Sequence, residues 1–151
     1  VITRLDGRRL PCWAENMFDR VLVDAPCTAT GIIRKSWEAA SSWTRRLAQR
    51  ISRLQRSLLL AGFDCLKPGG EIVYATCSLS PEENEETVNE LLQARPKAEP
   101  MDINLPGIHT RPGVTEWRGR RFDPDVANTI RIYPHDNDAE GFFIAKVAKA
   151  I

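Results

Sequence analysis

Two apolar runs in this sequence each stop at a cysteine, and this pattern constrains the fold more than any other. The first run extends from Val21 to Cys27 and the second from Ile72 to Cys77. Short apolar runs that end in turn residues are typical of buried strands in a parallel sheet. In open α/β sheets, ligands bind just beyond the carboxyl ends of such strands. We therefore expect both thiols to face one pocket.

A long helix is predicted between the two strands. From Trp43 to Leu66 the apolar residues recur at three- to five-residue intervals, and arginines occupy the positions between them. Lys67-Pro68-Gly69-Gly70 then ends the helix and turns the chain into the next strand, Glu71 to Ala75. A helical crossover of this kind makes the two strands parallel neighbours.

The remaining segments complete an α/β fold. Residues 1–5 are expected to end a strand before an Asp-Gly turn, and a second helix is expected to open at Ser80, its N-cap, with proline in the first turn. The proline- and glycine-rich stretch 96–125 predicts a long surface loop with fragments of strand. Residues 129–133 and 141–148 predict an antiparallel hairpin at a sheet edge.

Composition indicates one globular domain. The chain has 151 residues, of which 42% are hydrophobic and 27% charged, and its net charge of +1 gives no overall argument for a nucleic-acid partner. No stretch is long and apolar enough to span a membrane and the start lacks the apolar core of a signal peptide, so we expect a cytoplasmic protein without a membrane partner. A local basic cluster favours nucleic acid, although a solvated helix face explains it equally well; its members are Arg34, Lys35, Arg45, Arg46, Arg50, Arg53 and Arg56.

The four cysteines do not have the spacing of a metal site. No Cys-x-x-Cys pair is present and the chain has two histidines, so no structural metal is predicted. Cys12 and Cys65 are interpreted as packed or incidental free thiols. A thiol at the end of a strand acts as a nucleophile when its pKa is lowered or a base is near, but buried cysteine is common and packing alone is the alternative. Asp24, three residues before Cys27, and the hydroxyls on both sides of Cys77 favour chemistry.

Several segments resemble one family, the Sun-like (Fmu-like) RNA 5-methylcytosine methyltransferases, which use S-adenosylmethionine. The Asp-Ala-Pro-Cys and Thr-Cys-Ser motifs in this order are specific to it, whereas Lys-Pro-Gly-Gly is shared by many methyltransferases of the same Rossmann-like fold. Ala29 stands where glycine is frequent, a change that we expect to be tolerated. The segments that carry the resemblance are Phe18 to Cys27 with Thr30-Gly31, Leu66 to Gly70, Tyr74 to Ser78 with Pro81 to Asn84, and Gly141 to Ala145.

The resemblance implies a role for each candidate residue. Cys77 is expected to add to carbon 6 of cytosine, which makes carbon 5 nucleophilic enough to attack the methyl group of the cofactor. Cys27 is expected to assist product release, and Asp24 to lie at the cofactor and the base. In the related DNA enzymes the Pro-Cys thiol attacks, so the residues alone leave these two roles interchangeable. Asp6 is expected to accept a hydrogen bond from the adenine amine, with an ordinary Asp-Gly turn as the alternative.

The partner implied by the resemblance is ribosomal or transfer RNA. Arg34 and Lys35 are expected to bind its phosphates, and a solvated loop is the alternative.

The glycine-rich cofactor loop, the ribose-binding acid and the RNA-binding region of the family are expected upstream of Val1. Residues 1–151 are thus expected to be the C-terminal portion of one catalytic domain, mostly parallel in its sheet, and inactive alone. Two other functions stay open: an RNA-binding or scaffold protein without catalysis, and a methyltransferase for a small molecule or a protein.

Overall fold

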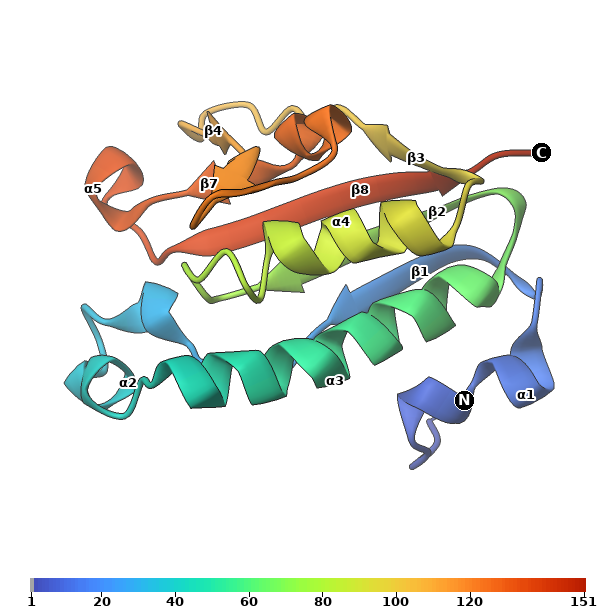
Figure 1. The fold of residues 1–151 in the computed structure, drawn as a ribbon, viewed down its shortest axis with the longest axis horizontal. Helices are drawn as coiled ribbons and strands as arrows, with labels where there is room; N and C mark the ends of the chain where they lie inside the picture. Colours follow the sequence, from blue (N-terminus) through green and yellow to red (C-terminus); the bar gives the residue numbers. More distant parts are fainter. Residues whose placement is uncertain (1) are drawn as a thin grey trace.

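A six-stranded mixed sheet with two helices on one face forms the protein (Figure 1). The structure is a computed structural model that describes residues 2–151. The strand order is β1-β2-β8-β7-β4, and β3 also pairs with β8. The strands of this sheet are β1 (Phe18–Asp24), β2 (Leu66–Thr76), β3 (Ala98–Met101), β4 (Arg111–Pro112), β7 (Ile130–Ile132) and β8 (Phe142–Lys149). A separate two-stranded hairpin consists of β5 (Glu116–Trp117) and β6 (Arg120–Arg121).

The pairing confirms an α/β fold with an antiparallel C-terminal hairpin. β1 and β2 are parallel, with Asp24 opposite Ala75, and form the parallel part of the sheet in residues 2–151. β8 runs antiparallel to β2, β3 and β7. Because the crossover helix joins β1 to β2, their carboxyl ends lie at the same edge of the sheet.

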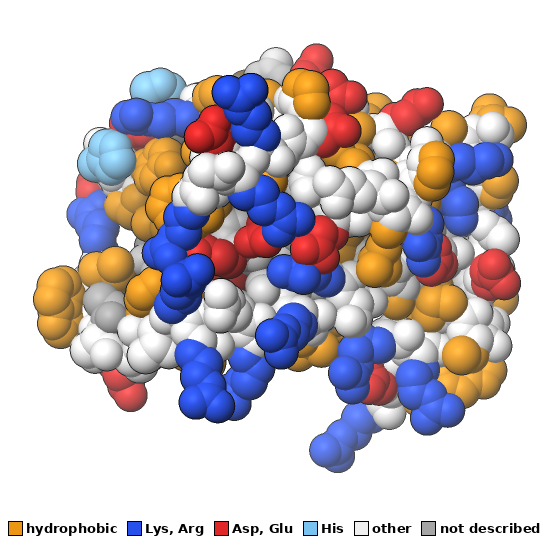
Figure 2. All heavy atoms as spheres, in the orientation of Figure 1, with side chains coloured by type: hydrophobic (Ala, Val, Ile, Leu, Met, Phe, Trp, Pro, Cys, Tyr) orange, Lys and Arg blue, Asp and Glu red, His pale blue; other side chains and the backbone are white. Residues whose placement is uncertain are grey.

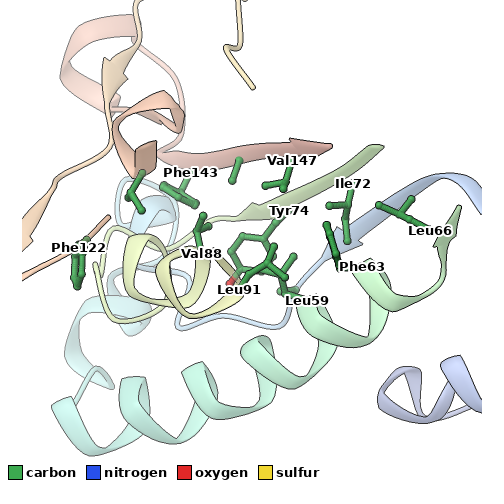
Figure 3. Close-up of a cluster of buried hydrophobic side chains, with 13 residues drawn as sticks. Leu59, Phe63, Leu66, Ile72, Tyr74, Val88, Leu91, Phe122, Phe143 and Val147 are labelled. Carbon is green, nitrogen blue, oxygen red and sulfur yellow. The ribbon is translucent and has the colours of Figure 1, made fainter. Parts of the chain in front are cut away.

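Two helices cover one face of the sheet. They are α3 (Arg45–Asp64), which is the predicted crossover helix, and α4 (Glu85–Ala94). Between them and the sheet lies a core of large apolar side chains, among them Leu59, Phe63, Tyr74, Leu91 and Phe143 (Figure 3). The shorter helices are η1 (Gly7–Arg9), α1 (Pro11–Ala14), η2 (Thr30–Ile32), α2 (Trp37–Ser41), η3 (Pro124–Asn128) and α5 (Pro134–Asn137). No helix within residues 2–151 is both long and apolar enough to cross a membrane.

Two predicted elements are wrong, and Lys67 to Gly70, predicted as a turn, lie within β2. Residues 2–5 form no strand, because no neighbouring strand supplies hydrogen bonds to them; Val1 lies outside the described residues. The helix predicted from Ser80 begins instead at Glu85. Pro81 to Asn84 form turns, in which the N–H of Glu83 donates to the carbonyl of Ser80 at 3.0 Å. The Ser80 hydroxyl does not cap the helix and accepts a hydrogen bond from the Trp43 indole.

Candidate active site

The two cysteine sulfurs meet at the carboxyl edge of the sheet. Cys27 follows β1 by three residues and Cys77 follows β2 directly. Their Sγ atoms lie 2.9 Å apart, both thiols are free, and both residues are partly buried. The expectation that the two sulfurs converge is confirmed, whereas the chemical role of each stays a prediction. Of the other two cysteines, Cys65 is buried and Cys12 exposed.

One buried carboxylate connects the two cysteine loops. Glu83 is fully buried and accepts a hydrogen bond from the Thr28 backbone N–H at 2.8 Å and another from the Thr28 hydroxyl. It also accepts one from the hydroxyl of Ser78 at 2.8 Å. Thr28 directly follows Cys27, and Ser78 directly follows Cys77. The carboxylate therefore fixes the relative position of the two thiols.

Side chains from α3 and β2 hold Glu83 in place. The amide of Gln55 donates to the Pro26 carbonyl at 2.8 Å and to the Glu83 carboxylate at 3.2 Å. The hydroxyl of Tyr74 donates to the backbone carbonyl of Glu83 at 2.6 Å. Sequence reasoning assigned Glu83 to the first turn of a helix and gave Gln55 no role. The contacts that join Glu83 to Gln55 and to Thr28 span 28 and 55 positions, so no local pattern indicates them.

Backbone contacts bring the two loops close together at Gly31. Its N–H donates to the carbonyl of Cys77 at 2.8 Å, and its own carbonyl accepts from the N–H of Gly141 at 2.9 Å. A Cβ at Gly31 would lie 2.3 Å from the Gly141 carbonyl oxygen and 2.8 Å from that of Cys77. Only glycine fits this approach. The close approach of the two loops therefore explains why glycine follows Thr30 in this segment.

The environment of Cys27 disfavours its thiolate. Burial, and after it the hydrogen bond with Cys77, raises the pKa of Cys27 to about 12. Desolvation acts in this direction because it penalises the charged form of a thiol. Cys27 is therefore a protonated thiol at neutral pH, and its S–H can donate to the sulfur of Cys77.

The two candidate aspartates lie in different places. Asp24 is exposed at the carboxyl end of β1, on the cysteine side of the sheet. Asp6 caps η1, and its carboxylate accepts hydrogen bonds from the Arg8 side chain at 2.6 to 3.1 Å, which lowers the pKa of Asp6 to about 2. In residues 2–151 no hydrogen bond or ion pair joins Asp6 to the cysteine loops. The Asp24 side chain likewise forms no hydrogen bond or ion pair with the cysteine loops in the described residues. Asp24 does lie at the carboxyl edge of the sheet, three positions before Cys27, whereas Asp6 lies at the start of η1.

The two candidate RNA-binding cations pair with acids. Arg34 lies 2.6 Å from the carboxylate of Asp138, and Lys35 lies 2.6 Å from that of Glu140. Both acids belong to the connection between α5 and β8. The cations remain largely exposed, at 53% and 76% of their side-chain area. Because ion pairs at a surface contribute little, these cations stay accessible to another anion.

No group of three or more His, Cys, Asp and Glu side chains in the described part of the chain has the geometry of a metal site. The polar groups around the cysteines are instead engaged with one another through Glu83. Within the described residues the site thus combines two thiols with a buried carboxylate that holds their loops.

Comparisons with known proteins agree with this geometry. A tRNA (cytosine(49)-C(5))-methyltransferase of Pyrococcus abyssi is 49% identical over 135 residues, which cover 89% of this chain and 43% of that protein. The 25S rRNA (cytosine-C(5))-methyltransferase nop2 of Schizosaccharomyces pombe is 39% identical over 153 residues, 99% of this chain and 25% of that protein. The crystal structure of NSun6 from Pyrococcus horikoshii with SFG matches with a TM-score of 0.80 and 32% identity, over 99% of this chain and 34% of that one.

The chain thus spans less than half the length of each of these relatives. A family model described as 16S rRNA methyltransferase RsmB/F matches residues 1–148, nearly the whole sequence. The match includes both cysteine motifs and the glutamate that connects them. The chain belongs to the RsmB/F methyltransferase family.

Proposed function

We propose that the protein containing this chain methylates carbon 5 of cytosine in RNA, with S-adenosylmethionine as methyl donor. The observation that carries the proposal is the 2.9 Å contact between the sulfurs of Cys27 and Cys77. The relatives named above act on cytosine carbon 5 in tRNA and in rRNA, which supports the same reaction here. Because the chain spans less than half of their length, the activity is proposed for the whole protein, and we expect residues 1–151 alone to be inactive.

Cys77 is the proposed nucleophile. Its thiolate adds to carbon 6 of the ring, and the electron pair of the carbon 5–carbon 6 double bond moves toward carbon 5, which becomes able to attack an electrophile. A base then removes the proton from carbon 5, and the bond between carbon 6 and sulfur breaks to release Cys77. Two observations support this choice of cysteine: Cys77 directly follows β2, and Cys27 holds its proton at neutral pH.

Cys27 is proposed to assist that release. Its sulfur lies next to the Cys77 sulfur, which becomes the leaving group when the bond to carbon 6 breaks. A neutral S–H at this distance donates to the departing thiolate and stabilises it. The raised pKa of Cys27 supports this role, because a thiolate there would repel the leaving group instead.

The cofactor is proposed to lie beside Asp24. S-adenosylmethionine, when bound, supplies the electrophilic methyl group. The Asp24 carboxylate has no hydrogen-bond partner in residues 2–151 and is exposed at the carboxyl end of β1, which fits a role in holding a polar group of the cofactor or the edge of the base. Asp6 is proposed to accept a hydrogen bond from the adenine amine. Its carboxylate is exposed and ionised at neutral pH, and Arg8, which donates to both of its oxygens, must move aside for this contact.

The test is methyl transfer by the full-length protein to tRNA and rRNA, each lacking the modification. We expect Cys77→Ala to abolish transfer and Cys27→Ala to accumulate a covalent protein–RNA complex, because release is slowed while attack continues. Cys12→Ala, at an exposed thiol away from the site, is the control and should behave as the wild type. Undiminished transfer by Cys77→Ala, or a covalent complex in that variant, would refute the assignment.

A further inference from the structure

The outward face of α3 carries cations without compensating acids. Five arginines fall within its first twelve positions, and the only acid of the helix is its last residue, Asp64. Solvated helix faces usually mix both signs of charge, because Glu and Lys or Arg one turn apart stabilise the helix. The solvated-face interpretation therefore does not account for this composition.

Folding stability does not account for the arginines either. Arg46 and Arg50 are four positions apart, and Arg50 and Arg53 are three apart, so like charges are neighbours on the helix surface. The first turn of α3 also contains Arg45 and Arg46 and no acid, although the positive end of the helix dipole favours acids there. Both arrangements oppose folding in the absence of a bound anion.

Most of these arginines are free in the structure. Arg56 pairs with Glu90 of α4 at 2.9 Å. In contrast, Arg45, Arg46, Arg50 and Arg53 are exposed and form no ion pair within residues 2–151. Lys and Arg side chains gather over α3 on the face shown in Figure 2.

The β5–β6 hairpin adds to this surface. A cavity of about 380 Å³ separates the hairpin from α3, with Arg45 and Arg53 on one side and Trp117 and Arg118 on the other. The guanidinium of Arg118 lies over the Trp117 ring, 5.6 Å from its centre. Glu82 and Glu86 line the same cavity and fix the hairpin through Trp117 and Arg120, so the free positive charge is that of α3.

The N-terminal half of α3 lies beside the candidate active site. Trp43, next to the start of α3, donates its indole N–H to the hydroxyl of Ser80 at 3.1 Å, and Ser80 is three residues beyond Cys77. From the middle of the same helix, Gln55 donates to the carbonyl of Pro26, next to Cys27. A polymer that places one nucleotide at the thiols and extends over this end of the fold would lie along α3.

We propose that the arginine face of α3, consisting of Arg45, Arg46, Arg50 and Arg53, binds the phosphate backbone of the substrate RNA outside the target cytosine. This inference rests on the proposed function for the identity of the polymer. Guanidinium groups bind phosphate oxygens with charge-assisted hydrogen bonds and need no base sequence. The face thus supplies affinity and orientation, while the thiols select the base.

The test compares two triple variants of the full-length protein that lose the same charge. One is Arg46→Gln, Arg50→Gln and Arg53→Gln; the control is Arg4→Gln, Lys67→Gln and Lys97→Gln, at exposed cations outside α3, of which Lys67 pairs with Asp19. Binding of a single-stranded RNA oligonucleotide is measured over a range of salt concentrations, without methyl donor. We expect the α3 variant to bind about tenfold more weakly at low salt and its log–log salt slope to become shallower by about 2, since each lost phosphate contact removes about 0.7. The control should retain the wild-type slope.

Methyl-transfer kinetics and competition with polyglutamate test whether the bound polymer is RNA. In methyl transfer, the α3 variant should show a raised KM for RNA and an unchanged kcat. Polyglutamate should compete poorly with RNA; equal competition would indicate an acidic protein as partner and overturn the proposal. Equal losses in both triple variants, or wild-type binding by the α3 variant, would also overturn it. Because binding is measured without methyl donor, α3-dependent binding in a protein that transfers no methyl group would refute only the proposed function.

Discussion

The buried carboxylate of Glu83 accepts a hydrogen bond from the backbone N–H of Thr28 at 2.8 Å, across 55 positions of sequence. The same carboxylate accepts from Ser78 at 2.8 Å. Since Thr28 and Ser78 each directly follow one of the two cysteines, the geometry of the thiol pair depends on a residue that takes no part in the proposed chemistry. Glu83 is a positioning residue.

Glu83→Gln tests this dependence. The glutamate oxygens accept from four donors, on Thr28, Ser78 and Gln55. A glutamine amide turns one of the two acceptors into a donor, so at least one buried donor is left unpaired, at a cost of about 1–3 kcal/mol in unfolding free energy. We expect kcat to fall at least tenfold, because the loops and their thiols separate. Urea unfolding and single-turnover methyl transfer check both effects.

The control for this variant is Glu86→Gln. Glu86 is in the same acidic run, but its carboxylate pairs with Arg120 of the hairpin and not with the cysteine loops. Its replacement should leave kcat unchanged. Wild-type turnover in Glu83→Gln would contradict the positioning role.

Local patterns in the sequence predicted the elements that build the edge of the sheet. The apolar runs before Cys27 and Cys77 are β1 and β2, and the periodic stretch between them is α3. These patterns succeed because each apolar run stops at turn residues at its carboxyl end and because α3 presents one apolar face to the sheet. Because β1 and β2 are parallel neighbours, the sequence also predicted that the two sulfurs lie close together.

Features that depend on distant contacts were not predictable. The acid-rich segment Glu82-Glu83-Asn84-Glu85 resembles the first turn of a helix, yet Glu83 accepts hydrogen bonds from the cysteine loops and Glu85 forms a buried ion pair with Arg131. These long-range bonds delay the start of α4 to Glu85. A buried carboxylate requires several hydrogen-bond donors from elsewhere in the chain, and the residues next to it in the sequence do not indicate which donors these are.

Gly31→Ala is expected to disrupt the site while the fold persists. A methyl group at this position would come within 2.3 Å of one carbonyl oxygen and 2.8 Å of another, so the Cys27 and Cys77 loops must move apart, at a cost of about 1–3 kcal/mol. Methyl transfer should fall by more than the loss of folded protein explains. Circular dichroism and activity at saturating RNA measure the two effects separately.

Gly69→Ala provides the comparison for Gly31→Ala. Gly69 has a φ of 80°, so alanine there is strained, but the nearest atom to its Cβ would be 3.9 Å away. This variant should lose stability without loss of turnover. Equal turnover in Gly31→Ala and the wild type would show that the close approach of the loops is dispensable.

Ala29→Gly is expected to stabilise the protein. The sequence suggested that alanine is tolerated here, and the structure shows what it costs: Ala29 has φ 56° and ψ 26°, in the left-handed region. That conformation costs an L-residue with a Cβ roughly 1–2 kcal/mol, and the greater entropy of glycine in the unfolded chain offsets up to about 1 kcal/mol of the gain. A net gain of about 0.5–1 kcal/mol should appear in urea unfolding. Ala39→Gly, inside α2, should instead destabilise the protein, and a loss at both positions would rule out strain at Ala29.

Cys27 should make stability depend on pH in the alkaline range. The native state raises the pKa of Cys27 from 9.0 to about 12, so between these values the unfolded chain releases a proton that the native state keeps. Because stability falls with pH wherever the native state binds more protons, the wild type should lose unfolding free energy as pH rises from about 9 toward 12. Cys27→Ala lacks this thiol, and titrating groups that do not interact with Cys27 cancel in the difference. Unfolding free energies of both proteins are measured in urea at pH 8, about 9.5 and about 10.5. The value for the wild type should fall relative to that for Cys27→Ala as pH rises. A constant difference across this range would mean that Cys27 ionises equally easily in the native and unfolded states.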